Sequence, residues 1–324
     1  MRKYIFIIIL IPFLLVNCSR NDSLSFEKDN IYISGKWENI GYFDFTPSSS
    51  NTGSPLKKTT EFISPPKLKL WELLAYFIIY SIAGYIIETL FALIRYGVLE
   101  SRQSFLYGPF CSIYGIGAVI MIVFLRYFMK NRITLFIGGF FIGSITEYLV
   151  SLIGELLLHV KWWDYSNMPL NINGRICFYY SVFWGILAIF LMKIIHPKIR
   201  NFLALLLKKF NYKNINNIII AINIFLAIDC IISAYAIDLF KIRMIVNYDL
   251  NVTNKNSIIK INQKIEQNKL NQKLTNTIFC DKIMLKTYPN LKVQCLDGSM
   301  IYFKDLLPDI KPYYLRLQEK DFYK

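Results

Sequence analysis

Charged side chains are scarce in this chain: they make up 18% of its 324 residues, whereas hydrophobic residues make up 54%. The mean hydropathy is +0.37. This balance excludes an ordinary soluble globular protein, in which the apolar share is lower and the charged share higher. The sequence therefore predicts a membrane protein that crosses the bilayer several times.

Acidic residues are especially few, because 22 Asp and Glu stand against 37 Lys and Arg and leave a formal net charge of +15. In a membrane protein such an excess lies in cytoplasmic loops and faces anionic lipid. The sequence contains no large basic soluble domain with interleaved aromatic residues. We therefore expect the lipid bilayer, and no nucleic acid, as a partner.

Several motifs that carry chemistry are missing from the sequence. No Gly-x-x-x-x-Gly-Lys pattern occurs, which excludes a nucleotide-binding P-loop in this chain. None of the six cysteines forms a Cys-x-x-Cys pair, so we expect no structural zinc site. No complete catalytic motif stands out. We predict no cofactor and no metal centre, and we favour a non-enzymatic role while leaving enzymatic activity open.

Residues 1–18 form a signal-like or lipoprotein-like segment. Arg2 precedes an apolar run that ends at Val16, which is the pattern of a secretory signal peptide. The residues before Cys18 resemble a bacterial lipoprotein cleavage box, with Cys18 as the lipidated residue. The alternatives are an uncleaved anchor or a translation start that lies elsewhere. Residues 19–66 are predicted to be a polar linker rich in Ser and Pro.

Five apolar segments follow, each near the roughly 20 residues that a helix needs to cross a bilayer. Short connections make neighbouring helices antiparallel. We therefore predict an all-α membrane protein whose residues 67–245 form a five-span transmembrane helical bundle. The predicted spans are Leu68–Ile94, Gly108–Phe128, Ile133–His159, Ile176–Ile195 and Ile218–Phe240.

Residues 246–324 are polar and predict a small α+β C-terminal domain. Its first half favours a helix over Ile258–Leu274. Its second half favours a β-hairpin in which Asp297-Gly298 turns the chain between Leu291–Leu296 and Ser299–Phe303.

The loops carry a charge bias that predicts orientation. Basic residues gather before the first span, after the second and after the fourth, which all lie on one side. The positive-inside rule places that side in the cytoplasm and the C-terminal domain outside, where Cys280 and Cys295 could form a disulfide. A signal-like start would instead place residues 19–66 outside, so the first 66 residues stay unresolved.

The third predicted span carries a polar stripe: Glu147, Ser151, Glu155 and His159 recur every four residues. A carboxylate in hydrocarbon costs roughly 2–3 kcal/mol, so both glutamates should face the bundle interior, water or a cation. Glu155 and His159 could share a cation or a proton. The alternative is that these side chains are solvated at the interface.

Two other spans contain carboxylates. Glu88 shares a helical face with Ser81 and Gly84, so it is either a functional carboxylate or a polar clamp in a packing seam. Asp229 lies near the middle of the fifth span, where it either pairs with a cation of the bundle or marks a shorter or tilted span.

The loop after the third span is unusually polar and aromatic. It contains Lys161-Trp162-Trp163-Asp164-Tyr165-Ser166, followed by Asn171-Ile172-Asn173-Gly174-Arg175. Tryptophan and tyrosine belong at the level of the lipid headgroups. Arg175 has a candidate partner in Asp164, either as a structural latch or as a pair that binds a carboxylate or phosphate group.

Helix alternation places this loop on the same membrane face as the loop near residues 95–107, so we predict a functional polar cluster there. Its members are Glu88, Arg102, Glu147, Glu155, His159, Trp162, Trp163, Asp164, Asn173 and Arg175.

Three groups of motifs carry a family resemblance. The first is Phe105 to Gly117 (FLYGPFCSIYGIG), the second joins Glu147-Tyr148 to Trp162 to Ser166, and the third runs from Asn171 to Cys177 and on to Trp184-Gly185 and His196-Pro197. Over roughly residues 68–240 the chain resembles the bacterial ABC-transporter permeases called type IV or CmpB-like. The chain departs from the family pattern in two places: the stretch Ser101-Arg102-Gln103-Ser104 keeps only the arginine of the usual Asn-Arg-Gly, and Ser112 replaces a common proline.

The resemblance implies a multi-pass protein of the bacterial inner membrane that moves a small or ionic solute with a separate ATPase, and it permits a homo-oligomer. The basic segment from His196 to Lys213 is the expected place for ATPase contact. The alternatives are a structural or envelope-organising membrane protein and a membrane-embedded enzyme that acts on lipid or envelope precursors.

Overall fold

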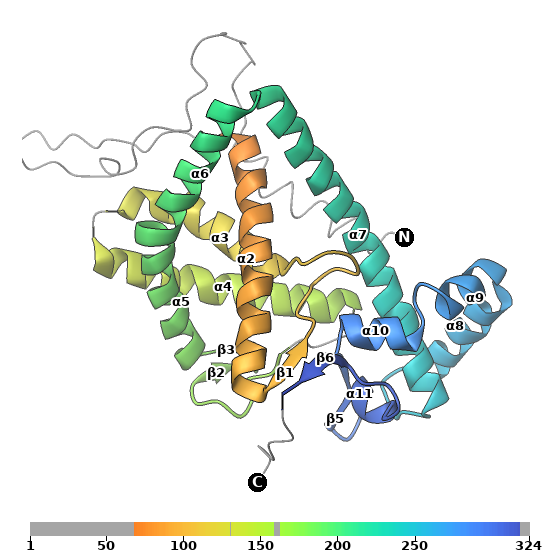
Figure 1. Cartoon of the computed structure of the whole chain (residues 1–324). Helices are drawn as coiled ribbons and strands as arrows, with labels where there is room; N and C mark the ends of the chain where they lie inside the picture. Colours follow the sequence, from red (N-terminus) through yellow and green to blue (C-terminus); the bar gives the residue numbers. More distant parts are fainter. Residues whose placement is uncertain (1–67, 130, 159–162, 318–324) are drawn as a thin grey trace, which may run out of the picture.

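The computed structural model describes residues 68–129, 131–158 and 163–317, and most of these residues are helical (Figure 1). The signal-like segment with Cys18, the polar linker, His159 and Trp162 lie outside the described residues. Cleavage and lipidation at Cys18 therefore stay predictions.

Four helices of the described chain are long and apolar enough to cross a membrane, so the prediction of a multi-pass helical membrane protein is confirmed. They are α2 (Leu70–Tyr96), α4 (Arg132–Leu158), a continuous helix from Phe178 to Lys209, and α7 (Tyr212–Asn247). Figure 1 shows α2 crossing in front of α3 and α4, with α5 and α7 on its two sides.

The predicted second span is shorter in the structure. Its helix consists of α3 (Ser112–Leu125) and the 3-10 turn η2 (Arg126–Phe128), and falls below the length of the four spans. Residues 101–111 are irregular because Gly108 takes a φ of 83° and side chains of α7 accept the backbone N–H groups of Leu106 and Tyr107. The hydrogen bonds of this segment therefore go to another helix instead of extending α3.

The fourth predicted span is too short. α5 (Phe178–Phe190) continues through a π-helical turn, η3 (Leu191–Ile195), into α6 (His196–Lys209) without a loop. Pro197 lacks the N–H that would bond within an α-helix, and the wider turn before it accommodates this missing bond. The basic C-terminal half that looked like a loop is thus an extension of the helix.

Glycines bring the helices close together. A Cβ at Gly139 of α4 would lie 2.2 Å from the Ala188 Cβ of α5, and one at Gly143 would lie 2.5 Å from the Trp184 Cβ. Gly84 of α2 receives the Tyr114 ring of α3 in the same way. Small residues permit this approach, which is how helices gain packing contacts inside a bilayer.

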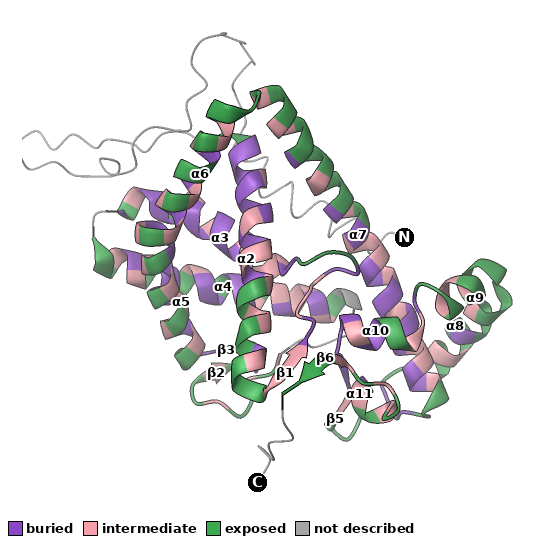
Figure 2. Cartoon of the chain, in the orientation of Figure 1, coloured by how far each residue is buried: buried purple, intermediate pink, exposed green. Residues whose placement is uncertain are grey.

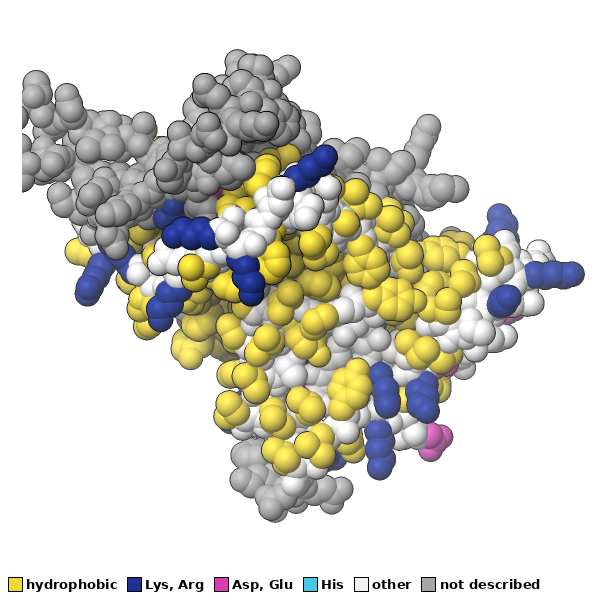
Figure 3. Space-filling model, turned by 45° about the horizontal axis from the view of Figure 1, so that its top comes forward, with side chains coloured by type: hydrophobic (Ala, Val, Ile, Leu, Met, Phe, Trp, Pro, Cys, Tyr) yellow, Lys and Arg dark blue, Asp and Glu magenta, His cyan; other side chains and the backbone are white. Residues whose placement is uncertain are grey.

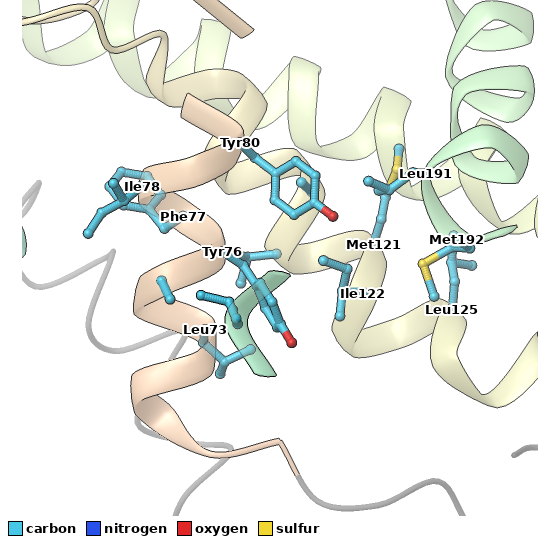
Figure 4. Close-up of a cluster of buried hydrophobic side chains, with 14 of the residues drawn as sticks. Leu73, Tyr76, Phe77, Ile78, Tyr80, Met121, Ile122, Leu125, Leu191 and Met192 are labelled. Atoms are coloured by element: carbon cyan, nitrogen blue, oxygen red, sulfur yellow. The ribbon is translucent and has the colours of Figure 1, made fainter. Parts of the chain in front are cut away.

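The main hydrophobic core lies between the N-terminal half of α2, α3, and the α5–η3–α6 helix. Figure 4 shows Tyr76 and Tyr80 of α2 pointing toward Ile122 and its neighbours on α3. The C-terminal half of α2 is largely exposed (Figure 2), and apart from Arg95 in the last turn its exposed side chains are apolar, as a lipid-facing surface requires.

The C-terminal region contains α8 (Lys255–Gln267), α9 (Lys269–Asn276), α10 (Asp281–Thr287), β4 (Lys292–Gln294), β5 (Met300–Tyr302), α11 (Phe303–Leu306) and β6 (Tyr313–Arg316). The predicted hairpin is confirmed, since β4 and β5 pair antiparallel around the Asp297-Gly298 turn. The predicted single helix is instead α8 and α9, because the Asn268 side chain caps α9 by accepting two of its backbone N–H groups.

This region is joined to the membrane bundle in two ways. Its apolar side chains form a second core with the C-terminal half of α7. In addition, β6 pairs antiparallel with β1 (Val98–Glu100), the short strand that directly follows α2. The predicted disulfide is wrong, because Cys280 and Cys295 are both free thiols. Cys295 is buried in the second core, where it packs as a small apolar side chain.

Candidate functional site

The loop between α4 and α5 ends in a tight hairpin of β2 (Asn171–Ile172) and β3 (Ile176–Cys177). Asn173 and Gly174 form its turn with φ values of 54° and 65°, a region that favours Asn and Gly. The Asn171 side chain accepts from the Gly174 N–H and donates to the carbonyls of Ser166 and Met168. Both asparagines are therefore used in building this loop.

The first part of the loop folds back onto this turn. The Trp163 Nε1 donates to the Arg175 carbonyl at 3.0 Å, and the Tyr165 N–H donates to the Gly174 carbonyl at 2.8 Å. The Asp164 carboxylate accepts from the N–H and the hydroxyl of Ser166 at 3.1 and 2.6 Å. The aromatic and acidic residues of the loop thus have a local structural role.

Gly174→Ala is expected to loosen this loop. A Cβ there would lie 2.5 Å from the Ser166 Oγ and 2.6 Å from the Asp164 Oδ1, in addition to the cost of a positive φ, about 1 kcal/mol. Gly97→Ala is the matched control, because Gly97 has a φ of 67° and nothing within 4 Å of its Cβ position. Proteolysis of the loop should rise in Gly174→Ala only. Equal rates in the two variants would contradict the tight fit.

Arg175 pairs with Glu155 of α4 at 2.7 Å, and its guanidinium also donates to Ser151 at 3.2 Å. Tyr148 adds to this contact, since its ring lies 5.8 Å from the guanidinium and its hydroxyl accepts from Asn173. The ionic partner of Arg175 is thus Glu155 on the helix, and not the predicted Asp164, whose carboxylate is turned to Ser166. The pairing of Glu155 with His159 lies outside the described residues.

Glu147 lies two turns deeper on the same face of α4, and its residue is only 6% exposed. One carboxylate oxygen accepts from the Tyr165 hydroxyl and the other from the Trp184 Nε1 of α5, both at 2.9 Å. Both donors are neutral. The carboxylate is therefore hydrogen-bonded in the bundle by groups that do not cancel its charge.

Tyr165 connects the loop to this carboxylate. Its ring stacks on Tyr180, with 4.6 Å between the ring centroids. Burial, together with the Glu147 carboxylate, raises the pKa of the Tyr165 phenol well above its ordinary value. The hydroxyl consequently stays protonated and remains a donor to Glu147 at physiological pH.

Glu88 of α2 is bonded in a similar way. The Tyr114 hydroxyl of α3 donates to it at 2.5 Å, and the same tyrosine lies within electrostatic range of Glu147. One tyrosine thus interacts with two carboxylates from different helices, by a hydrogen bond to Glu88 and electrostatically with Glu147. The neutral donors Tyr114, Tyr165 and Trp184 could not be assigned from the sequence, because aromatic residues in apolar helices usually indicate packing alone.

Arg102 lies elsewhere. It forms an ion pair with Glu100 of β1 at 2.7 Å, and Glu100 also accepts from Asn290 of the C-terminal region at 3.1 Å. Asp229 of α7 is not paired with a cation of the bundle in the contacts of the described chain. It accepts from the Tyr107 N–H and the Ser233 hydroxyl, and so holds the loop before α3.

A second polar cluster, which the sequence did not predict, lies at the other end of α2. It consists of Glu72, Tyr76, Tyr80, His196 and Arg200, all buried. The Tyr80 hydroxyl lies 3.1 Å from the His196 Nδ1, the Tyr76 ring packs edge-on against the imidazole, and the Arg200 guanidinium interacts electrostatically with Tyr76 and Glu72. Two features of the sequence could have pointed to this cluster. They are the spacing of Lys69 and Glu72, which is typical of a helix start, and the His196-Pro197 motif.

One comparison with known proteins gives a match. A family model described as "Putative ABC-transporter type IV" matches residues 75–234, which run from α2 through most of α7. Neither a curated protein nor a solved structure matches the chain. The match contains Glu88, Glu147, Glu155 and Arg175, whereas most of the C-terminal region follows it. The chain is a multi-pass membrane protein, and its residues 75–234 belong to this ABC-transporter type IV family.

Proposed function

We propose that this chain is the permease component of an ABC transporter, which moves a small or ionic solute with energy from a separate ATPase subunit. Family membership supports the transporter class. The observation that carries the proposal is Glu147, a buried carboxylate in a membrane bundle whose hydrogen-bond donors are neutral. An ionisable group at such a position is expensive, and it marks a path for ions or solutes more often than it stabilises a fold.

The path in this proposal follows the polar face of α4. Glu155 and Arg175 lie where the helix meets the loop, and Glu147 and Glu88 follow further into the bundle. A negatively charged interior favours cations or protons over anions, while the Arg175 guanidinium at the entrance adds a group that can exchange partners. Arg175 contacts α4 through its guanidinium and Trp163 of the loop through its carbonyl, so its movement would change both contacts.

The proposed topology follows from lengths and charges. We infer that α3 with η2 is a fifth membrane-embedded helix, whose length of about 26 Å is slightly below the roughly 30 Å of the hydrocarbon core. In this proposal the chain lies in the bacterial inner membrane. The positive-inside rule then places the basic connection from α6 to α7, which contains Lys208, Lys209 and Lys213, on the cytoplasmic side. An ATPase subunit would bind the chain on this side, because ATP is in the cytoplasm.

α6 supplies the surface for such an ATPase. Its inner face is buried through His196, Arg200 and Leu203, whereas Phe202 and Leu205 on its outer face are 53% and 63% exposed. These apolar side chains lie beside lysines near the end of the helix. A partner with an apolar groove and acidic rim would cover this surface.

The first test is purification of the intact chain from its native membrane in mild detergent, followed by mass spectrometry of the co-purifying chains. We expect a stoichiometric ATPase, and we expect Leu205→Asp to release it, because a charge in the apolar contact cannot be solvated there. Lys198→Asp, an exposed change on the same helix, tests charge alone. Reproducible absence of any ATPase would contradict the permease proposal.

The solute path gives a separate prediction. Glu147→Gln, Glu155→Gln and Arg175→Ala should each change the cellular content of at least one ion or small metabolite, because each removes a charge from the path. Asp297→Asn is the control, since this carboxylate lies in the exposed turn between β4 and β5. Comparison of ion and metabolite content in complemented cells checks the prediction. Unchanged content in all three variants would remove these residues from the path.

A further inference from the structure

A groove lies where the membrane-spanning part of α7 meets the C-terminal region. Its volume is about 560 Å³, within the range of pockets that hold a ligand. Its walls come from the loop before α3, from α7, and from the end of α9 with the segment before α10. The lining is almost entirely apolar and includes Tyr107, Ile232, Tyr235, Leu274, Ile278 and Phe279.

The groove continues an exposed apolar stripe of α7. Ile224 and Ile228 are 57% and 52% exposed, and Ile232 follows them at the same four-residue spacing inside the groove. α7 is about 54 Å long, which exceeds the roughly 30 Å of a hydrocarbon core, so the bilayer ends along this helix. A hydrocarbon chain can thus pass from the bilayer along the stripe into the groove without crossing water.

The helices beside the groove are basic. Residues 255–287 contain seven lysines against one glutamate and one aspartate. On α9 the exposed Leu270 lies one turn before Leu274 of the groove wall, and Lys269 and Lys273 flank this apolar face. Figure 3 shows hydrophobic side chains over much of one face of the molecule, with Lys and Arg side chains in several groups around them. Such a helix suits the interface of an anionic membrane.

We propose that this groove binds an acyl chain of an anionic phospholipid from the surrounding bilayer, with the headgroup beside Lys269 and Lys273. The apolar lining and the stripe on α7 favour an acyl chain as the ligand, and the lysines favour a negatively charged headgroup. The bound lipid fills the space between α7 and α9, where the Tyr235 hydroxyl already donates to Asn271 at 2.7 Å. It would therefore add a further non-covalent connection between the C-terminal region and the membrane bundle, besides the second core and the β1–β6 pair.

The test uses the full-length chain, delipidated in detergent and titrated with phosphatidylglycerol or with phosphatidylcholine of the same chains. Native mass spectrometry counts the bound lipids. We expect one tightly held phosphatidylglycerol, and binding about tenfold weaker in Ile232→Trp, because the indole occupies the space of several methylenes. Leu296→Trp, at an exposed position between β4 and β5 that does not line the groove, should bind like the unchanged chain.

Two further variants keep the proposal testable if Ile232→Trp is unstable. Ile278→Trp fills the groove from the opposite wall and should also weaken binding, while Lys269→Gln with Lys273→Gln should remove the preference for phosphatidylglycerol over phosphatidylcholine. Equal binding of the two lipids by the unchanged chain would overturn the headgroup assignment. Undiminished binding in a folded Ile232→Trp or Ile278→Trp protein would overturn the groove as the site.

Discussion

Gly139→Ala should destabilise the membrane bundle by about 3 kcal/mol, which is the upper end for an added methyl group in a close-packed interior. The new Cβ would lie 2.2 Å from the Ala188 Cβ and 2.9 Å from the Trp184 carbonyl oxygen. The latter is backbone of α5, which cannot rotate away as a side chain does. α4 and α5 would have to separate along their shared face.

Separation of these helices would also disturb the site. Trp184 of α5 donates to Glu147 of α4, so an increase in the helix distance lengthens that hydrogen bond. Thermal denaturation in detergent should show a large drop in the midpoint for Gly139→Ala, and lower transport activity should accompany it.

Gly117→Ala is the matched control for this prediction. Gly117 also faces Trp184, but its added Cβ would meet the indole at 3.9 Å, an ordinary van der Waals contact. Alanine is favoured over glycine within a helix by roughly 0.5–1 kcal/mol, so this variant should be as stable as the original or slightly more stable. If both variants lost the same stability, close approach of α4 and α5 would not be the cause.

Much of the architecture is predictable because it depends on local sequence. Apolar segments of sufficient length identified the helices that cross the membrane, and the Asp297-Gly298 turn identified the β4–β5 hairpin. The four-residue spacing of Glu147, Ser151 and Glu155 placed these side chains on one face of α4, and the structure directs all three toward the loop or α5. Helical periodicity fixes such relations without knowledge of the partner.

Partners distant in sequence were not predictable in the same way. Arg102 finds Glu100 beside it, but Glu100 in turn contacts Asn290, and Asp229 binds backbone N–H groups more than 100 residues before it. Backbone groups carry no side-chain signature, so a carboxylate that caps a loop looks the same in sequence as one that awaits a cation. The short second span was not predictable for the same reason, because the loop that precedes α3 is held by hydrogen bonds to α7, which is distant in sequence.

The second large loss of stability is expected from a substitution in the buried polar cluster near the start of α2. Glu72 is 0% exposed and Arg200 is 8% exposed, and the Arg200 guanidinium interacts electrostatically with Glu72 and Tyr76. Arg200→Met should cost about 3 kcal/mol of stability, the upper end for a substitution that disrupts a buried polar network, because it removes a guanidinium that acts electrostatically on the buried Glu72 carboxylate. Thermal denaturation in detergent measures the loss.

A double substitution separates the charge from the packing. Glu72→Gln combined with Arg200→Met should recover much of the stability lost in Arg200→Met, because the neutral amide does not need a cation, and the cycle isolates the pair's interaction. Lys198→Met, on the exposed side of the same helix, should change stability by no more than about 0.5 kcal/mol. An Arg200→Met variant as stable as Lys198→Met would show that the cluster contributes nothing to stability. A large loss with no recovery in the double variant would mean that the guanidinium acts through Tyr76 and helix packing, and that Glu72 is neutralised by another group.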